Sequence, residues 1–245
     1  MFAIKICRAH RTTSITASVV LAGIIPLDLR IKEHAHQYEI KRGKTLDLLN
    51  SQKIEGKISS FTLPHPAETV NIRFSLITSQ EEIREDIESF NYYTNGSKLN
   101  GGVGCGISRW KNGVEISGNN FKLTHYCSVY QAELLAIFKA TEIIIHENDL
   151  NSSIYSDSRS SLEEISNSKT EHPIVYKIHE NIKEIKRCNQ HIRFYWVKAH
   201  NSILGNERAD ELAKEGALSN ELIPIYDSFP ISYARNSIRA ATIET

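Results

Sequence analysis

The chain has 245 residues, 40% hydrophobic and 24% charged, a composition that is ordinary for a globular protein and excludes a disordered or low-complexity chain. Its 29 lysines and arginines balance its 29 aspartates and glutamates, so any phosphate-binding surface has to be a local patch. The four cysteines form no C-x-x-C pair, which argues against zinc and favours free, mostly buried thiols in a reducing, intracellular compartment, with two disulfides as the alternative.

The first thirty residues look like a signal peptide only superficially. In "MFAIKICRAHRTTSITASVVLAGIIPLDLR", threonines and serines dilute the apolar stretch, and no small-x-small cleavage site precedes "PLDLR". The stretch is also too short to span a bilayer, so we expect short packed helices and no membrane partner. Between Lys41 and Gln80 the pattern is weakly periodic. The breaker "LPHPAE" and short apolar pieces such as "IRFSLI" predict a domain boundary within residues 64–88.

The pattern then becomes regular. The stretches "FNYYT", "GGVGCGISRW" and "VEISGNNFKL" predict three strands, and "KNG" predicts a hairpin turn, so these strands form an antiparallel meander. A long helix, "SVYQAELLAIFKATEIIIHEN", leads to the strand "SSIYSDS" and the short helix "SRSSLEEISN". The helix "IVYKIHENIKEIKRC", the strand "HIRFYWVKAH" and the helix "GNERADELAKEGAL" follow. Helical crossovers make the later strands parallel, which predicts a mixed α/β sheet.

Three acidic residues occupy positions where packing against the sheet is expected. Glu133 lies in the middle of the apolar face of the long helix; a salt bridge or a snorkelling side chain is the alternative explanation. Asp157 follows a strand at its carboxyl end, where ligands gather, or else it caps the next helix. Asp210 shares a helix face with Asn206 and two alanines, or else it is a first-turn acid favoured by the helix dipole.

Carboxylates from three separate elements at one sheet edge repel one another, and such clusters normally hold hard cations. Mg²⁺ prefers oxygen ligands and suits phosphate substrates. Two such ions, about 3.5–4 Å apart, can activate water and stabilise the leaving oxygen of a phosphodiester. Asn95, at the end of the strand "NYYTN", would bring an uncharged polar side chain to the same edge.

Four motifs resemble a known family. "YTNGSK", "CSVYQAELLAI", "IYSDSRSSLE" and "FYWVKAHNSILGNERADELAKEGA" are similar, in order and spacing, to the type 1 ribonuclease H domain, as in the carboxyl-terminal part of non-LTR retrotransposon reverse-transcriptase polyproteins. "TTSITASVVLAGIIPLDL" further resembles the segment after the reverse-transcriptase palm. The resemblance implies a reverse-transcriptase-derived extension over 1–87, a ribonuclease H domain over 88–217 and a tail over 218–245. It implies a five-stranded mixed sheet flanked by helices, with a mainly helical N-terminal extension.

The same resemblance implies chemistry: cleavage of the RNA strand of an RNA–DNA hybrid, with two Mg²⁺ ions per site, or Mn²⁺ in their place. Glu133, Asp157 and Asp210 correspond to three of the family's four catalytic, metal-binding acids, and His200 corresponds to its loop histidine. Asn95 occupies the position of the first catalytic aspartate and, as an amide, brings no charge to the metals. We therefore expect an impaired enzyme. The alternatives are a non-catalytic nucleic-acid-binding remnant, or a purely structural remnant that binds neither metal nor hybrid.

Several other residues are candidates for nucleic-acid contact. Gly96 and Ser97 could present backbone groups to the RNA strand, and Ser158 and Arg159 could reach phosphates or the sugar edge; turn geometry or an ordinary surface charge is the alternative for each. The basic stretch "KEIKRC" either holds the DNA backbone or is a solvated helix face. The sequence does not indicate an oligomeric state.

Overall fold

The computed structural model describes residues 2–44, 46, 53–59, 65, 69, 71–77, 79, 89–199 and 201–244. The chain forms two compact units. The first comprises residues 1–54 and 229–245, and the second comprises residues 55–228. The predicted domain limits at 87/88 and 217/218 differ from this division and stay predictions. The predicted boundary region at 64–88 lies largely outside the described residues.

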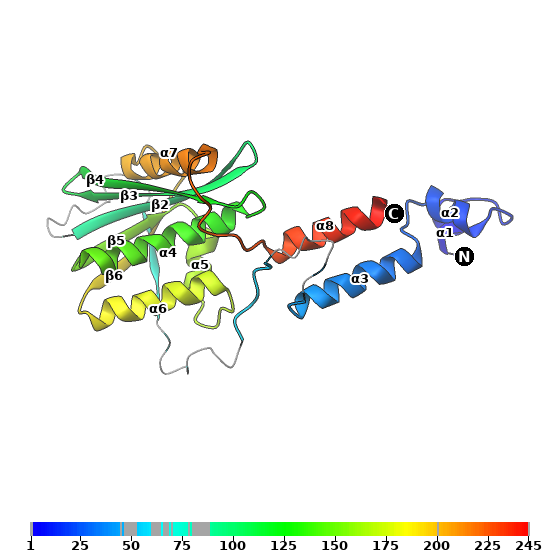
Figure 1. Ribbon diagram of the computed structural model, residues 1–245, viewed down its shortest axis with the longest axis horizontal. Coiled ribbons are helices and arrows are strands. Elements are labelled where there is room, and N and C mark those ends of the chain that lie inside the picture. Colours follow the sequence, from blue (N-terminus) through cyan, green and yellow to red (C-terminus); the bar gives the residue numbers. More distant parts are fainter. Residues whose placement is uncertain are drawn as a thin grey trace. The chain divides into compact units, whose positions relative to one another are not determined.

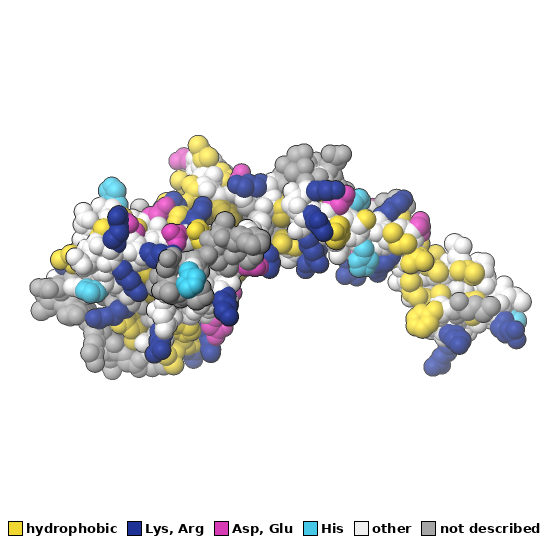
Figure 2. Space-filling view, turned by 90° about the horizontal axis from the view of Figure 1, so that it is seen from below, with side chains coloured by type: hydrophobic (Ala, Val, Ile, Leu, Met, Phe, Trp, Pro, Cys, Tyr) yellow, Lys and Arg dark blue, Asp and Glu magenta, His cyan; other side chains and the backbone are white. Residues whose placement is uncertain are grey.

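The first unit is helical, as the N-terminal pattern predicts. It contains α1 (Phe2–Ile6), α2 (Ile15–Leu21), α3 (Leu27–Lys41) and α8 (Ile231–Glu244), and α3 packs against α8. The α2 helix begins at Ser14, whose hydroxyl accepts a hydrogen bond from the backbone N–H of Ala17 at 3.1 Å. Many apolar side chains of this unit stay on its surface, Phe2 among them at 77% exposed (Figure 2).

The second unit is built on a mixed sheet in the order β1-β6-β5-β2-β3-β4. Its strands are β1 (Phe74–Ile77), β2 (Ser89–Leu99), β3 (Gly102–Lys111), β4 (Val114–Leu123), β5 (Asn151–Ser156) and β6 (His191–Val197). The β2–β3–β4 meander is antiparallel, and β5, β6 and β1 add in parallel, as the crossover argument predicts. The expectation of five strands is wrong: the described residues form six. The additional strand, β1, extends the sheet because "FSLI" pairs with the free edge of β6.

One face of the sheet carries α7 (Leu204–Leu218), which lies directly on β3 (Figure 1). The close approach follows from the glycines of β3. A Cβ atom on Gly104 would stand 2.3 Å from the backbone nitrogen of Ala217, and one on Gly106 would stand 2.3 Å from the carbonyl oxygen of Ala209. Any side chain at these positions would therefore displace α7 and every residue that it carries to the sheet edge.

The opposite face is covered by α4 (Val129–Glu147), with α5 (Arg159–Ser166) and α6 (Pro173–Arg187) beyond it (Figure 1). A capping box fixes the start of α4: Gln131 N–H donates to the Ser128 hydroxyl at 3.2 Å, and Ser128 N–H donates to Gln131 Oε1 at 2.9 Å. The helix also passes very near β2, because Gly96 has no side chain. A Cβ atom there would lie 2.6 Å from the backbone nitrogen of Glu133.

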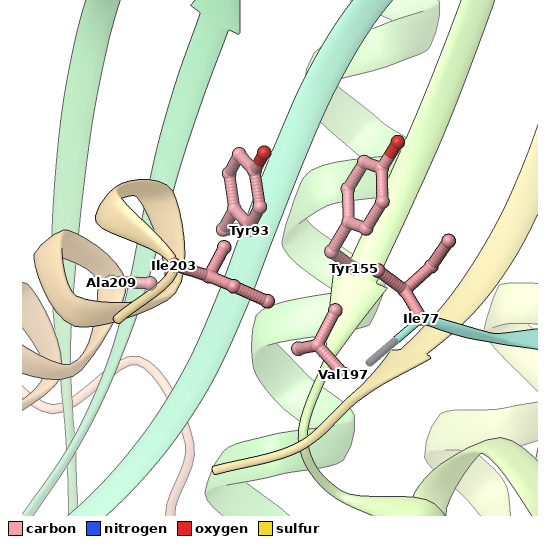
Figure 3. Packing of buried hydrophobic residues seen from close by; sticks show 6 residues of the cluster. All are labelled: Ile77, Tyr93, Tyr155, Val197, Ile203 and Ala209. Atoms are coloured by element: carbon pink, nitrogen blue, oxygen red, sulfur yellow. The ribbon is translucent and has the colours of Figure 1, made fainter. Parts of the chain in front are cut away.

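Tyrosine rings, among them those of Tyr93 and Tyr155, lie on the face of the sheet that carries α7 (Figure 3). Tyr93 stacks on Tyr155 with 4.8 Å between ring centroids, and Tyr155 stacks on Tyr195 with 4.9 Å between them. Tyr93 also lies under Gly205, where a Cβ atom would be 2.1 Å from the ring. The residues of β2 on the same side as Tyr93, which include Asn95, therefore face α7.

Two further expectations concern the chain as a whole. All four cysteines are free thiols, as predicted; Cys105 and Cys127 are buried, whereas Cys7 is half-buried and Cys188 is exposed. None of the described helices is long and apolar enough to cross a membrane.

Candidate active site at the carboxyl ends of the central strands

Asn95 and Asp157 lie side by side. The register between the parallel strands β2 and β5 pairs Thr94 with Ser156, so the next residue of each strand stands at the same level. Asn95 is 7% exposed and lies opposite Gly106 of β3. The sequence rule that polar residues gather beyond the carboxyl ends of parallel strands thus places these two side chains together.

Glu133 reaches this edge from the other face of the sheet. Because β5 ends at Ser156 while β2 continues to Leu99, Gly96 lies beyond the last β5 partner, and its backbone N–H donates to the Glu133 carboxylate. The side chain is 7% exposed, and Oε2 has no hydrogen-bond partner among the described residues. The salt bridge considered as an alternative for Glu133 is likewise absent from the described part of the chain.

The pKa of the Glu133 carboxyl is raised well above its usual value. Burial is the largest cause, the negative charge of Asp157 adds to it, and the charge of Asp210 contributes in the same direction. The Gly96 N–H opposes the shift without cancelling it. The three acids are therefore near enough to one another to interact electrostatically, as expected for carboxylates at one sheet edge.

Asp157 contacts α7 and β6. Asn206 Nδ2 lies 3.5 Å from Asp157 Oδ2, and Trp196 Nε1 donates to the Asp157 carbonyl at 2.9 Å. The N-cap residue of α5 is Ser158, and its side chain makes no capping hydrogen bond. The sequence pattern indicates Asn206 only as a small neighbour of Asp210. The four-residue helical spacing of these two side chains indicates that both face the site.

Asp210 lies in the second turn of α7, so it is not the first-turn acid that the dipole alternative requires; Glu207 has that position. Its carboxylate forms an ion pair with Lys214, with 2.5 Å between Oδ2 and Nζ. Lys214 is one turn further along the helix and half exposed. Asp210 is thus paired with a half-exposed cation, unlike Glu133.

The other predicted residues are placed less distinctively. His200 lies outside the described residues, so its role stays a prediction. Arg159 forms an exposed ion pair with Glu163 at 2.8 Å, and the Ser158 hydroxyl contacts that of Ser161 at 2.7 Å. Ser97 follows Gly96 on β2 and is half-buried. Ser97, Ser158 and Arg159 border the carboxyl ends of β2 and β5, and their contact with nucleic acid stays a prediction.

The side chains fit a hard cation in chemistry and in location, since Glu133, Asp157 and Asp210 offer carboxylate oxygens and one buried oxygen of Glu133 is unsatisfied. The distances between these side chains are too large for a metal site as the structure stands. Within the described ranges, no group of three or more Asp, Glu, His or Cys side chains is close enough to hold an ion. A cation held by all three acids would therefore require their side chains to come closer together.

Comparison with known proteins identifies the family of the chain. The profile of the family described as RNase H matches residues 88–218, more than half of the chain. The chain belongs to the RNase H family. This family consists of hydrolases that act on RNA–DNA hybrids and generally use divalent metal ions, usually Mg²⁺. A comparison with curated protein sequences found no match.

Several solved structures are similar to the chain. The N-terminal RNase H domain of rv2228c from Mycobacterium tuberculosis, solved as a fusion with maltose-binding protein, is 16% identical, with a TM-score of 0.44 over 53% of this chain and 98% of that chain. RNase H1 from the halophilic archaeon Halobacterium salinarum is 18% identical, with a TM-score of 0.44 over 52% and 96%. LC11-RNase H1, isolated from compost, is 20% identical, with a TM-score of 0.42 over 53% and 96%.

Proposed function

We propose that this chain is an intracellular ribonuclease H of a non-LTR retrotransposon reverse transcriptase that hydrolyses the RNA strand of RNA–DNA hybrids with two divalent cations, and that Asn95 impairs it. The supporting observation is the position of Asn95. It stands beside Asp157 at the sheet edge that Glu133 and Asp210 also approach, so an amide occupies the place where a carboxylate would give the site a fourth acid. The origin of residues 1–87 in a reverse transcriptase rests on sequence resemblance, and residues 218–245 are proposed as the tail that follows the domain.

The proposed chemistry assigns each residue a distinct task. Divalent cations at this edge would activate water and stabilise the charge on the phosphodiester. Glu133, Asp157 and Asp210 would supply anionic oxygens, and the Gly96 N–H keeps the Glu133 carboxylate oriented toward the end of β2. Asn95 offers one neutral oxygen, and its NH₂ group is a donor that a cation repels. Ser97, Ser158 and Arg159 would contact the nucleic-acid backbone, and His200 would assist proton transfer or product release.

The decisive experiment compares the native chain with Asn95→Asp for cleavage of a labelled RNA–DNA hybrid in Mg²⁺ and in Mn²⁺. We expect Asn95→Asp to cleave at least about 10²-fold faster, because a preorganised electrostatic group is commonly worth that much. Asn112→Asp is the matched control. It makes the same chemical change at the β3–β4 hairpin, where Asp-Gly forms the same turn as Asn-Gly.

Equal cleavage by the native chain and Asn95→Asp would show that three acids suffice and that Asn95 does not impair the site. Hybrid binding without cleavage by either protein would favour the non-catalytic remnant. A second readout is independent of activity: the melting temperature with EDTA and with millimolar MgCl₂. Mg²⁺ should stabilise Asn95→Asp more than the native chain, because a ligand that binds only the folded state raises its stability.

A further inference from the structure

A hollow of about 260 Å³ lies at the far edge of the sheet from the meander, between β1, β6 and the last turn of α6. Its polar lining consists of Arg73, Lys186, Arg193, Asn71, Ser75 and Tyr195. The other lining residues are three isoleucines and Phe194. Three cations, an amide, two hydroxyls and no described acid therefore surround one space, a donor set that suits an anion.

The two arginines of this hollow stand directly beside each other. Phe74 of β1 pairs with Phe194 of β6 in parallel register, so Arg73 and Arg193 occupy the same level one residue earlier. Like charges at adjacent positions of neighbouring strands are unfavourable. Neither arginine makes an ion pair with any residue that the structure describes. An anion bound between them would relieve this repulsion and could accept hydrogen bonds from both guanidinium groups.

The third cation of the hollow, Lys186, differs from its basic neighbours on α6 in having no acidic partner among the described residues. The basic stretch at the end of this helix contains Lys183, Lys186 and Arg187. Lys183 pairs with Glu180 at 2.7 Å, and Arg187 pairs with Glu184 at 2.6 Å. Lys186 has no such partner among the described residues and lines the hollow instead. Of the two explanations for this stretch, a solvated face therefore suits Lys183 and Arg187, and anion binding suits Lys186.

Arg193 points to the same face of the sheet as Asp157, whereas α6 lines the hollow from the opposite face. Arg193 pairs with Ser153 of β5, and Asp157 follows Ser153 by four residues, so alternation places the three side chains on one face. Four residues of a parallel strand span about 13 Å. A nucleic-acid strand carries one phosphate per roughly 3.4 Å of helix axis. A strand whose scissile phosphate lies at Asp157 would thus have a phosphate near Arg193 about four nucleotides away.

We propose that Arg73, Arg193 and Lys186 form a phosphate-binding pocket that anchors the nucleic-acid substrate outside the active site. The pocket takes one phosphodiester group of the hybrid, held by the two guanidinium groups and the ammonium. This inference rests on the proposed function, since the anchored strand is the one that reaches the acidic site. The balanced charge of the chain requires affinity to come from such local patches, and Figure 2 shows lysine and arginine side chains dispersed over the second unit.

The test is the salt dependence of hybrid binding by fluorescence anisotropy, with EDTA present so that no strand is cut. Lys186→Ala and Arg193→Ala should each reduce the slope of log Kd against log salt by about 1, the value for one lost phosphate contact. Arg193→Lys keeps the charge and should retain most of the slope. Arg187→Ala is the matched control, because that arginine is paired with Glu184 outside the pocket, and its slope should be unchanged.

Each remaining outcome has one interpretation. Native slopes in both Lys186→Ala and Arg193→Ala would overturn the pocket and leave the proposed function intact. A native chain that does not bind hybrid at all would overturn both proposals. A last experiment uses inorganic phosphate as the ligand and measures the melting temperature. If it raises the melting temperature of the native chain but not of Arg193→Ala, while the hybrid slopes stay equal, the pocket serves a small anion and the nucleic-acid anchor is wrong.

Discussion

Both ends of the sheet bury charged groups. At one end the buried charges are paired with opposite charges, whereas at the other end Glu133 is buried beside like charges. At the end away from the candidate active site, Arg109 of β3 is 8% exposed and Asp149 is 3% exposed. Arg109 Nη2 lies 2.6 Å from Asp149 Oδ1, and Nε donates to Oδ2 at 3.1 Å. The Tyr92 hydroxyl donates to the same carboxylate, and Glu147 takes a further hydrogen bond from Arg109 at 3.0 Å. Arg109, Asp149 and Glu147 are thus all paired.

The electrostatic consequences follow from that pairing. Burial alone would lower the pKa of Arg109, but the hydrogen bond and the charge of Asp149 outweigh it, so the pKa is raised and the guanidinium stays charged. Burial and the hydrogen bond to Asp149 raise the pKa of Tyr92, so its hydroxyl stays protonated and remains a donor. Glu133, at the other end, is buried beside two like charges, and one of its oxygens has no partner among the described residues.

The contrast separates two uses of buried charge. A paired network such as that of Arg109 and Asp149 is consistent with the fold alone, because removing either partner leaves an unsatisfied ion. A buried carboxylate that has an unsatisfied oxygen and lies beside like charges, as Glu133 does, is unfavourable for the fold and is retained where a ligand completes it. Both readings predict what substitution should do to stability, and the signs are opposite.

The largest expected effect is at the paired end. Asp149→Ala leaves Arg109 buried without its main partner and should lower the free energy of unfolding by about 3–5 kcal/mol. Urea denaturation followed by circular dichroism measures this. Glu142→Ala is the control, since Glu142 is half exposed, lies on α4 shortly before Asp149 and pairs with Lys139 at 2.7 Å; its loss should be under about 1 kcal/mol. A loss near that of the control in Asp149→Ala would show that the network contributes little.

The next effect has the opposite sign. Because the pKa of Glu133 is raised in the folded state, the folded protein is more stable with this carboxyl protonated than with it ionised. That cost is absent below the ordinary pKa of 4.5 and grows as pH rises from there through the folded-state value. Glu133→Gln should therefore raise the melting temperature at pH 7.5 in EDTA, by about 2–4 °C per kcal/mol of relieved repulsion. The gain should vanish below pH 4.5.

Glu180→Gln serves as the control for this pH profile, since Glu180 is an exposed acid on α6 that pairs with Lys183. It should show no gain at pH 7.5. A Glu133→Gln protein that melts at or below the native temperature at neutral pH would mean that the carboxylate is satisfied in solution. The distinction between the two ends of the sheet would then be lost.

Local sequence pattern predicts much of this molecule, because its main elements have strong local signals. The glycines of "GGVGCGIS" and the small face of α7 indicate close helix–sheet packing, and "KNG" indicates the hairpin. The meander, the parallel crossovers and the carboxyl-end positions of Asn95 and Asp157 follow from the same local signals. The exception is β1. Its four residues carry too little pattern to be distinguished from a loop, and they become a strand only by pairing with β6, which is distant in sequence.

The site could be predicted only to the level of which residues meet. Asp157 and Glu133 are placed by strand ends and helix phase, which sequence reveals. Whether Asp210 turns toward them or toward Lys214 is decided by side-chain rotamers, which leave no trace in the pattern. The Arg109–Asp149 network is also invisible in the sequence, since its two members lie in separate elements and neither position is unusual by itself.

The smallest expected effect concerns Lys214, the ion-pair partner of Asp210 at the acidic end. As an exposed ion pair one helical turn apart, Lys214 and Asp210 should contribute about 0.3–0.5 kcal/mol, so Lys214→Ala barely changes urea stability. Its effect on cation binding should be clearer, because Lys214 competes for the Asp210 carboxylate. In the Asn95→Asp background, Lys214→Ala should lower the Mg²⁺ concentration that gives half of the maximal thermal stabilisation. Lys183→Ala removes a similar exposed pair on α6 and should leave that concentration unchanged. An unchanged value in Lys214→Ala as well would mean that Asp210 is not a ligand, and that the acidic end binds its cation through its other carboxylates.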